Sequence, residues 1–134
     1  MLEGRDWYRV VGAPPSDIEA LKRTAKKALP ESYFALLAHS NGGEGPLATS
    51  PFQFQLDPAL VTMQQIIDDT FAEFFPGLVV FGSNGGGDAI AFDTRGDAPF
   101  PIVAFDMTNN DLDESITPIA PDFDAFLDLV GIEN

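Results

Sequence analysis

The chain has 134 residues, of which 21 are acidic and seven are basic, and its net charge at pH 7 is −14. This length predicts a single domain that buries about two thirds of its unfolded surface. Twelve residues are phenylalanine and none is cysteine, so the core forms without disulfides, and thiol catalysis and thiolate metal sites are excluded. The first residues lack the apolar core of a signal peptide, and no stretch approaches the roughly 20 apolar residues of a membrane span. We therefore expect a soluble, cytoplasmic protein.

Charge is distributed unevenly along the chain. Residues 1–27 carry six basic and four acidic side chains, whereas residues 28–134 carry 17 acidic side chains and one basic residue, Arg95. An acidic surface repels phosphate backbones, which predicts no direct binding to nucleic acid. It attracts a basic protein partner. The alternative interpretation is that the acidity serves solubility alone.

The first third of the chain predicts two helices. Ser16 and Glu19 have the spacing of a capping box, with Ser16 as the N-cap of a helix that ends near Ala28. Pro30 suits the first position of a second helix, and the glycine-rich segment 41–43 ends it.

A strand and a third helix follow. Phenylalanine or leucine alternates with glutamine over residues 52–56, the pattern of a half-buried strand. Asp57 suits the N-cap and Pro58 the first turn of the next helix. The predicted core face of this helix consists of Leu60, Met63, Ile67 and Phe71.

The second half of the chain is typical of strands. Apolar runs at Leu78–Ser83, Ala89–Asp93 and Pro101–Asp106 are separated by Gly, Asn and Asp, and a short strand is expected at Ser115–Ile119. Asp122 then suits the N-cap of a last helix that Gly131 ends. Because the loops between these strands are too short for crossover helices, we expect an α+β domain: a mainly antiparallel β-sheet with helices packed on one face.

Several segments together resemble the SMI1/KNR4 (SUKH) family. They comprise residues 17–21 with the "LPxxY" segment 29–33 and the "NGG" segment 41–45, then the hairpin 81–93, and finally 101–103 with the closing helix 122–127. The chain departs from the family pattern in two places. Asp122 stands where the closing "SFxxFL" motif usually has Ser, and Phe52 and Phe54 occupy a region that often carries Trp.

The resemblance covers residues 16–130 and implies an SMI1/KNR4-like domain at 16–134 after an N-terminal extension at 1–15. Bacterial members commonly act as immunity proteins that neutralise polymorphic toxins, often nucleases, and fungal relatives regulate cell-wall and signalling processes. The resemblance therefore implies a toxin–antitoxin immunity protein, a monomer or weak homodimer, that binds a basic cognate toxin. The alternatives are a regulatory or scaffolding protein with no toxin partner, and a hydrolase or metal-dependent enzyme. The family has no established catalytic residues, so none are assigned.

The glycine-rich segment 82–88 is the first candidate for chemistry. No Lys-Ser/Thr follows it and the next residues predict a strand, so it is not a P-loop. Glycines that adopt positive φ in a hairpin connection explain it better. It could still contact a protein partner.

Oxygen-bearing side chains gather between Asp106 and Glu114, and this loop also includes Asn109 and Asn110. Such a loop could hold Ca²⁺, but its spacing is not that of an EF-hand, and a solvated acidic loop is the preferred interpretation. We expect no metal and no cofactor. The residues predicted to contact a partner are Asp88, Asp93, Asp97, Asp106, Asp111, Asp113 and Glu114.

His39 is the single histidine, and we expect it in the last turn of the second helix, where a cation interacts favourably with the helix dipole. One histidine without a cysteine or an evident nucleophile predicts a structural role. No spacing among the 21 acids selects a pair for acid–base catalysis. The sequence therefore favours a binding protein over an enzyme.

Overall fold

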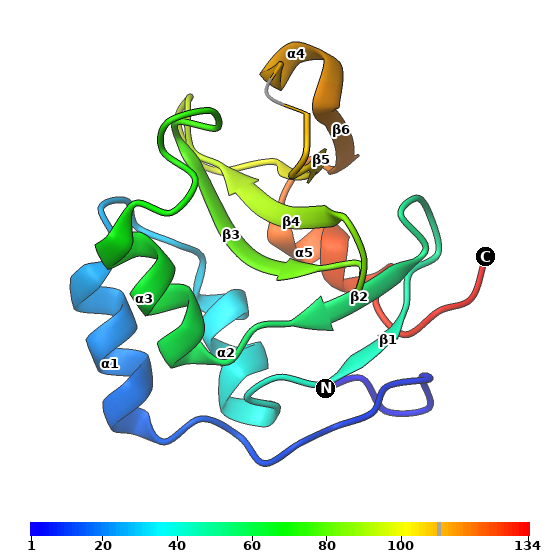
Figure 1. Cartoon of the computed structure of the whole chain (residues 1–134). Helices are drawn as coiled ribbons and strands as arrows, with labels where there is room; N and C mark the ends of the chain where they lie inside the picture. The colour runs from blue at the N-terminus through cyan, green and yellow to red at the C-terminus, as the bar shows by residue number, and fades with distance from the viewer. Residues whose placement is uncertain (110) are drawn as a thin grey trace.

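The computed structural model describes residues 1–109 and 111–134, which form five helices and six strands (Figure 1). The helices are α1 (Pro15–Thr24), α2 (Glu31–His39), α3 (Ala59–Asp68), α4 (Leu112–Ser115) and α5 (Phe123–Leu127). The strands are β1 (Glu44–Pro46), β2 (Gln53–Leu56), β3 (Leu78–Ser83), β4 (Asp88–Asp93), β5 (Ile102–Asp106) and β6 (Ile116–Ala120).

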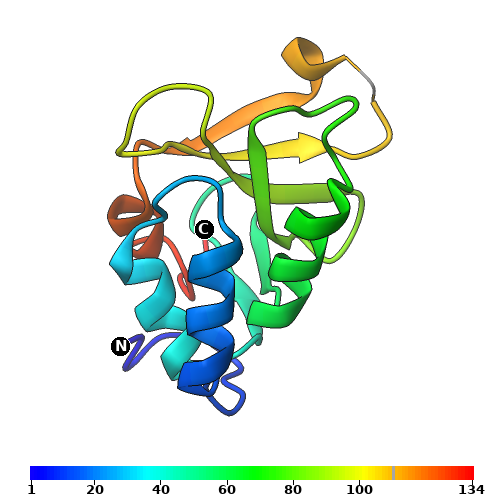
Figure 2. The ribbon, with the colours of Figure 1, turned by 90° about the vertical axis from the view of Figure 1, so that its left-hand side faces the viewer.

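All the strands belong to one sheet, whose spatial order follows the chain from β1 to β6. Every neighbouring pair is antiparallel, and α3 lies in the connection between β2 and β3. On the helical side, α1 packs between α2 and α3 (Figure 2). The predicted α+β fold is confirmed.

The larger core lies between the sheet and the helices. The ring of Tyr33 on α2 lies 5.2 Å from that of Phe92 on β4 and 5.6 Å from that of Phe123 on α5, both in edge-on geometry. Each fully buried aromatic side chain stabilises the fold by about 2–3 kcal/mol. The core thus depends on aromatic side chains, as the phenylalanine content predicts. Its largest fully buried members are Tyr33, Phe54, Phe81, Phe92, Phe123 and Phe126.

A smaller core covers the other face of the central strands. Ile90 and Phe92 of β4 belong to the larger core, whereas Ala89 and Ala91 belong to the smaller one. Phe71 and Leu112 pack against this smaller core, so the segment after α3 and the helix α4 cover part of the second face. Its buried members are Phe75, Leu78, Val80, Ala89, Ala91, Val103 and Phe105.

The predicted start and end of α1 are wrong. The N-cap is Pro14, and Ser16 lies within the first turn because Pro15, whose φ is already helical, begins the helix one residue earlier. Ala25 has extended dihedral angles, so the helix ends at Thr24, before Ala28.

The predicted starts of the next two helices are also displaced. Pro30 is the N-cap of α2, not its first residue, and Pro58 replaces Asp57 as the N-cap of α3. The backbone N–H of Ala59 at the start of α3 donates to the side-chain oxygen of Asn41, at 2.8 Å. A residue 18 positions upstream therefore performs the capping that the sequence assigned to Asp57.

Two of the four residues predicted to form the core face of α3 are exposed. Leu60 is 45% exposed and Ile67 is 56% exposed, whereas Ala59 and Thr62 are fully buried. Met63 does pack against the larger core. Apolar side chains occur on two sides of this helix, so periodicity alone could not select the buried one.

The first 13 residues pack against the rest of the chain. The N–H of Tyr8 donates to the carbonyl of Glu44 on β1 at 2.8 Å, and the N–H of Asp6 donates to the carbonyl of Gly131 at 2.9 Å. The ring of Trp7 lies 5.7 Å from that of Phe54. This segment thus extends the pairing at the β1 edge of the sheet, a contact that the sequence did not indicate.

Candidate protein-binding surface

Three of the predicted contact residues lie at α4. Asp111, Asp113 and Glu114 are all exposed. The Asp111 carboxylate accepts the backbone N–H groups of Asp113 at 3.1 Å and of Glu114 at 3.4 Å, so it caps this short helix. The Asp113 and Glu114 side chains remain directed to solvent. An exposed aromatic residue, Phe74, lines an open hollow together with Asp111 and Asp113, and no local pattern in the sequence indicates this neighbour.

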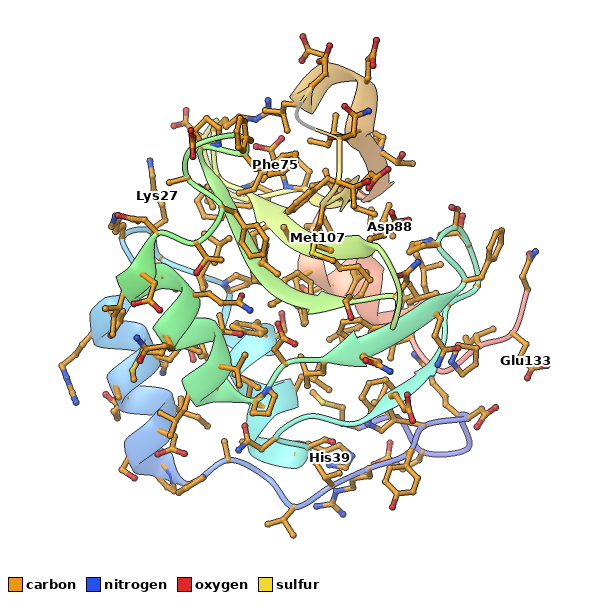
Figure 3. All side chains as sticks on the ribbon, in the orientation of Figure 1. Lys27, His39, Phe75, Asp88, Met107 and Glu133 are labelled. Atoms are coloured by element: carbon orange, nitrogen blue, oxygen red, sulfur yellow. The ribbon has the colours of Figure 1, made fainter. Side chains whose placement is uncertain are left out.

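Two further predicted residues lie side by side on neighbouring strands. The register pairs Asp88 at the start of β4 with Asp106 at the end of β5. The Asp106 carboxylate accepts the N–H of Thr108 at 2.9 Å and its hydroxyl at 2.7 Å, and these bonds lower the pKa of Asp106 below its ordinary value. Figure 3 labels Asp88 with the adjacent Met107, whose N–H donates to the carbonyl of Gly87. This end of the sheet thus carries negative charge at neutral pH.

The last two predicted residues lie at the opposite end of β4, where Asp93 is the final residue of the strand, and in the loop that follows. The Arg95 guanidinium donates to both oxygens of Asp93, at 2.9 and 2.8 Å, and this lowers the pKa of Asp93. The same pair raises the pKa of Arg95, and the charge of Asp113 adds to this effect. Asp97 is exposed in the loop that follows. The seven predicted residues therefore lie at three places: α4, the Asp88 end of the sheet and the loop after β4.

The glycine-rich segment considered for ligand chemistry forms a tight turn. In the turn between β3 and β4, the Asn84 side chain accepts the N–H groups of Gly86 at 2.8 Å and of Asp88 at 3.2 Å, and Gly85 has a φ of +79°. Within the described residues, no group of three His, Asp or Glu side chains is arranged to hold a metal ion. Asn110, part of the predicted oxygen-rich loop, lies outside those residues.

His39 is in the last turn of α2, as predicted. Burial, followed by the charge of Arg9, lowers the pKa of His39, so the imidazole is less readily protonated than in water. Arg9 instead brings a cation to this helix end, because its Nε donates to the His39 carbonyl at 2.7 Å. The predicted position of His39 is therefore confirmed, and Arg9 supplies a charged group at the same helix end.

A groove that the sequence did not reveal lies among the end of α1, the end of α3 and the start of β3. Its volume is about 270 Å³. Its walls come from three separate segments, residues 25–29, residues 65–80 and Thr94, so no local motif could indicate it. Figure 3 labels two lining residues, Lys27 and Phe75.

The comparisons with known proteins agree with this architecture. The model of the SMI1/KNR4 family (SUKH-1) matches residues 12–129, which span nearly the whole chain from the segment before α1 to the end of α5. No curated protein is similar enough to count as a relative. No helix among the described residues has the length and apolar character needed to cross a membrane. The chain therefore belongs to the SMI1/KNR4 family (SUKH-1).

Proposed function

We propose that the chain is an immunity protein that binds and neutralises a cognate basic toxin, without catalysing a reaction itself. Family membership supports a role in protein–protein interaction. The observation that carries the proposal is the excess of carboxylates over cations: 17 acidic side chains and one basic side chain follow residue 27. The single basic residue of that part, Arg95, is already paired with Asp93.

The exposed carboxylates at α4 would act through charge complementarity. Asp113 and Glu114 accept no hydrogen bond from another side chain within the described residues, so a basic partner would not have to displace one. A negative surface raises the association rate of a basic partner and makes binding depend on salt. If the toxin is a nuclease, the same surface would compete with its nucleic-acid substrate for the basic active site.

Titration calorimetry against the toxin encoded by the neighbouring gene tests this proposal. We expect tight binding that weakens as the salt concentration rises. In stopped-flow kinetics, the double variant Asp113→Asn with Glu114→Gln should reduce the association rate about tenfold. Asp128→Asn with Glu133→Gln removes the same charge at the C-terminal end of the chain and serves as the control.

The outcomes separate the parts of the proposal. Equal losses in the two double variants would mean that total charge steers the partner and that α4 is not the contact surface. Tight binding that does not respond to salt would refute the electrostatic contribution but retain the immunity function. No binding to the toxin would refute the immunity function and favour a regulatory role with no toxin partner.

A further inference from the structure

One edge of β3 lacks a neighbouring strand along half of its length. β4 pairs with β3 from Leu78 to Ser83, but β2 pairs with it, in the described part of the chain, at Gly82 and Ser83 alone. The N–H of Thr94 donates to the carbonyl of Gly77 across the β3–β4 pair. Main-chain groups alternate along an antiparallel strand, so the carbonyl of Leu78 points away from β4, toward the free edge. The N–H of Leu78 donates to the carbonyl of Phe75, and the carbonyl of Phe81 accepts the N–H of Asp57, so the open part of the edge ends before Phe81, where the register with β4 becomes irregular.

This free edge lies in the groove described above. Leu78, Val79 and Val80 line its floor, and the remaining apolar walls come from the helical side and from the turn before β3. A free strand edge beside an apolar pocket is the arrangement by which extended peptides join a sheet: the main chain bonds to the edge and a side chain fills the pocket. The apolar side chains of the lining include Leu29, Ile66, Phe71, Phe75, Leu78 and Val80.

The charged residues that line the groove are Lys26, Lys27 and Asp69, so its rim carries a small net positive charge in a chain that is acidic as a whole. Lys26 and Lys27 both line it, and Lys22 and Arg23 lie just before them on α1. Lys26 pairs with the exposed Asp69 at 3.2 Å, whereas Lys27 has no carboxylate partner among the described residues. Charge complementarity therefore favours an acidic occupant here, opposite in sign to the partner expected for the acidic surface.

We propose that this groove binds an extended acidic peptide segment of a partner protein, one of whose large apolar side chains fills the pocket while its main chain adds to the edge of β3. The groove volume of about 270 Å³ is sufficient for one large apolar side chain of a peptide. The proposal does not rest on the immunity function, because the two sites differ in charge and position. The protein would thus bind partners of opposite charge at separate surfaces.

Selection of random peptides displayed on phage, against the whole chain, tests the proposal directly. We expect enriched sequences that combine acidic residues with one large apolar residue. For a fluorescent synthetic peptide of the enriched sequence, Lys27→Glu should weaken binding about tenfold or more, measured by anisotropy. Arg23→Glu makes the same charge change on α1 outside the groove lining and should alter the affinity by less than about threefold.

Two further measurements locate the peptide. Ala72→Trp fills the groove from an exposed lining position and should abolish binding, whereas Ala38→Trp on the exposed side of α2 should not. The peptide should shift the backbone amide NMR signals of Leu78–Val80 most strongly. Circular dichroism of each variant confirms that it is folded.

Several outcomes would overturn the proposal. These are a selection that enriches no peptide or enriches basic peptides, NMR shifts confined to other elements, and equal losses for Lys27→Glu and Arg23→Glu. A concentration-dependent dimer that Lys27→Glu disrupts, in the absence of any peptide, would assign the groove to a second copy of the chain instead. None of these results bears on toxin binding, so the proposal and the immunity function can fail separately.

Discussion

The carboxylates predicted to contact a partner differ in the hydrogen bonds that they already accept within the protein. Asp93, Asp106 and Asp111 accept hydrogen bonds from side chains or backbone N–H groups of their own loops. Asp113 and Glu114 are exposed and bond to no other side chain among the described residues. Substituting Asp93, Asp106 or Asp111 changes local structure as well as charge. Substituting Asp113 or Glu114 therefore gives the cleaner test of partner binding.

The Asp93–Arg95 pair makes the stability of the protein depend on pH. Arg95 lowers the pKa of Asp93 in the folded state, so the stabilisation is fully present above the ordinary pKa of the carboxyl. It is lost as the pH falls through the lowered folded-state pKa. Because Arg95 is 42% exposed, we expect Arg95→Met to lower the free energy of unfolding at pH 7 by about 0.5–1 kcal/mol. Urea denaturation should show this difference shrinking toward zero in strong acid, and a constant difference would contradict the assignment.

Tyr33 has a fully buried side chain, and its hydroxyl group leads to a second prediction about a single residue. Its hydroxyl has no hydrogen-bond partner of normal geometry among the described residues, and neither does the hydroxyl of Thr62. A buried hydroxyl without a partner costs about 1–3 kcal/mol, so Tyr33→Phe should leave stability unchanged or raise it by about 1 kcal/mol. Tyr33→Leu, which removes the ring, should destabilise the protein by about 2–4 kcal/mol. A clear loss of stability in Tyr33→Phe, measured by thermal denaturation, would show that the hydroxyl bonds in solution.

At the scale of elements, the N-terminal segment depends on close approach to β1. A Cβ atom added at Gly45 would lie 2.4 Å from the carbonyl oxygen of Asp6 and 2.9 Å from the ring of Trp7. We therefore expect Gly45→Ala to detach residues 1–9 and to lower stability by about 2 kcal/mol. Trp7 is the single tryptophan, so its fluorescence should shift to longer wavelength as the ring becomes hydrated.

Gly87→Ala is the matched control for this prediction. A Cβ atom there has no neighbour within 4 Å among the described residues. Its Trp7 fluorescence and its stability should stay close to those of the unmodified chain. Unchanged Trp7 fluorescence in Gly45→Ala would show that the segment accommodates the methyl group without leaving the edge of β1.

Five of the six strands and the start of the last helix could be predicted from the sequence because their signals are local. The strand β1 and the helix α4 were not predicted, Ser115 belongs to α4 and not to the strand expected there, and α5 ends at Leu127, before the predicted end at Gly131. The predicted strand Leu78–Ser83 has the observed bounds of β3, and the predicted Ala89–Asp93 differs from β4 by one residue. Asp122 caps α5 as predicted, since its carboxylate accepts the N–H of Ala125 at 2.8 Å. Alternating apolar residues, flanking glycines and a capping carboxylate all lie within a few positions of the elements they define.

Features that depend on distant residues could not be predicted. The side chain that caps α3 belongs to Asn41, and the buried side of α3 is set by α1 and β3, which pack against it. The same limit applies to the candidate sites. The acidic character of the surface is a property of composition, whereas the groove at β3 requires the ends of two helices and one strand to meet.

On the scale of the whole molecule, three of the seven basic side chains hold parts of the structure together. Arg5 donates to the carbonyls of Leu127 and Val130 at the end of α5, Arg9 to the carbonyl of His39, and Arg95 to Asp93. These three cations do little to neutralise the carboxylates on the rest of the surface. The other four basic side chains lie at the end of α1 and just after it. The molecule is therefore polarised, with a small basic region beside the groove and an acidic surface over the rest.

The excess of negative charge also affects stability. A net charge of −14 destabilises the folded state, because the carboxylates repel one another. Sodium chloride screens that repulsion, so we expect the melting temperature to rise with salt, by about 4 °C for each kcal/mol gained. The variant with Asp97→Asn, Asp113→Asn and Glu114→Gln carries three fewer negative charges and should show a smaller rise. A melting temperature that falls with salt would mean that local pairs such as Lys26–Asp69 outweigh the long-range repulsion, and that the acidic surface costs the fold little. A smaller rise in the variant would instead show that the acidic surface lowers the stability of the fold. Such a cost is expected if the surface serves to bind a basic partner.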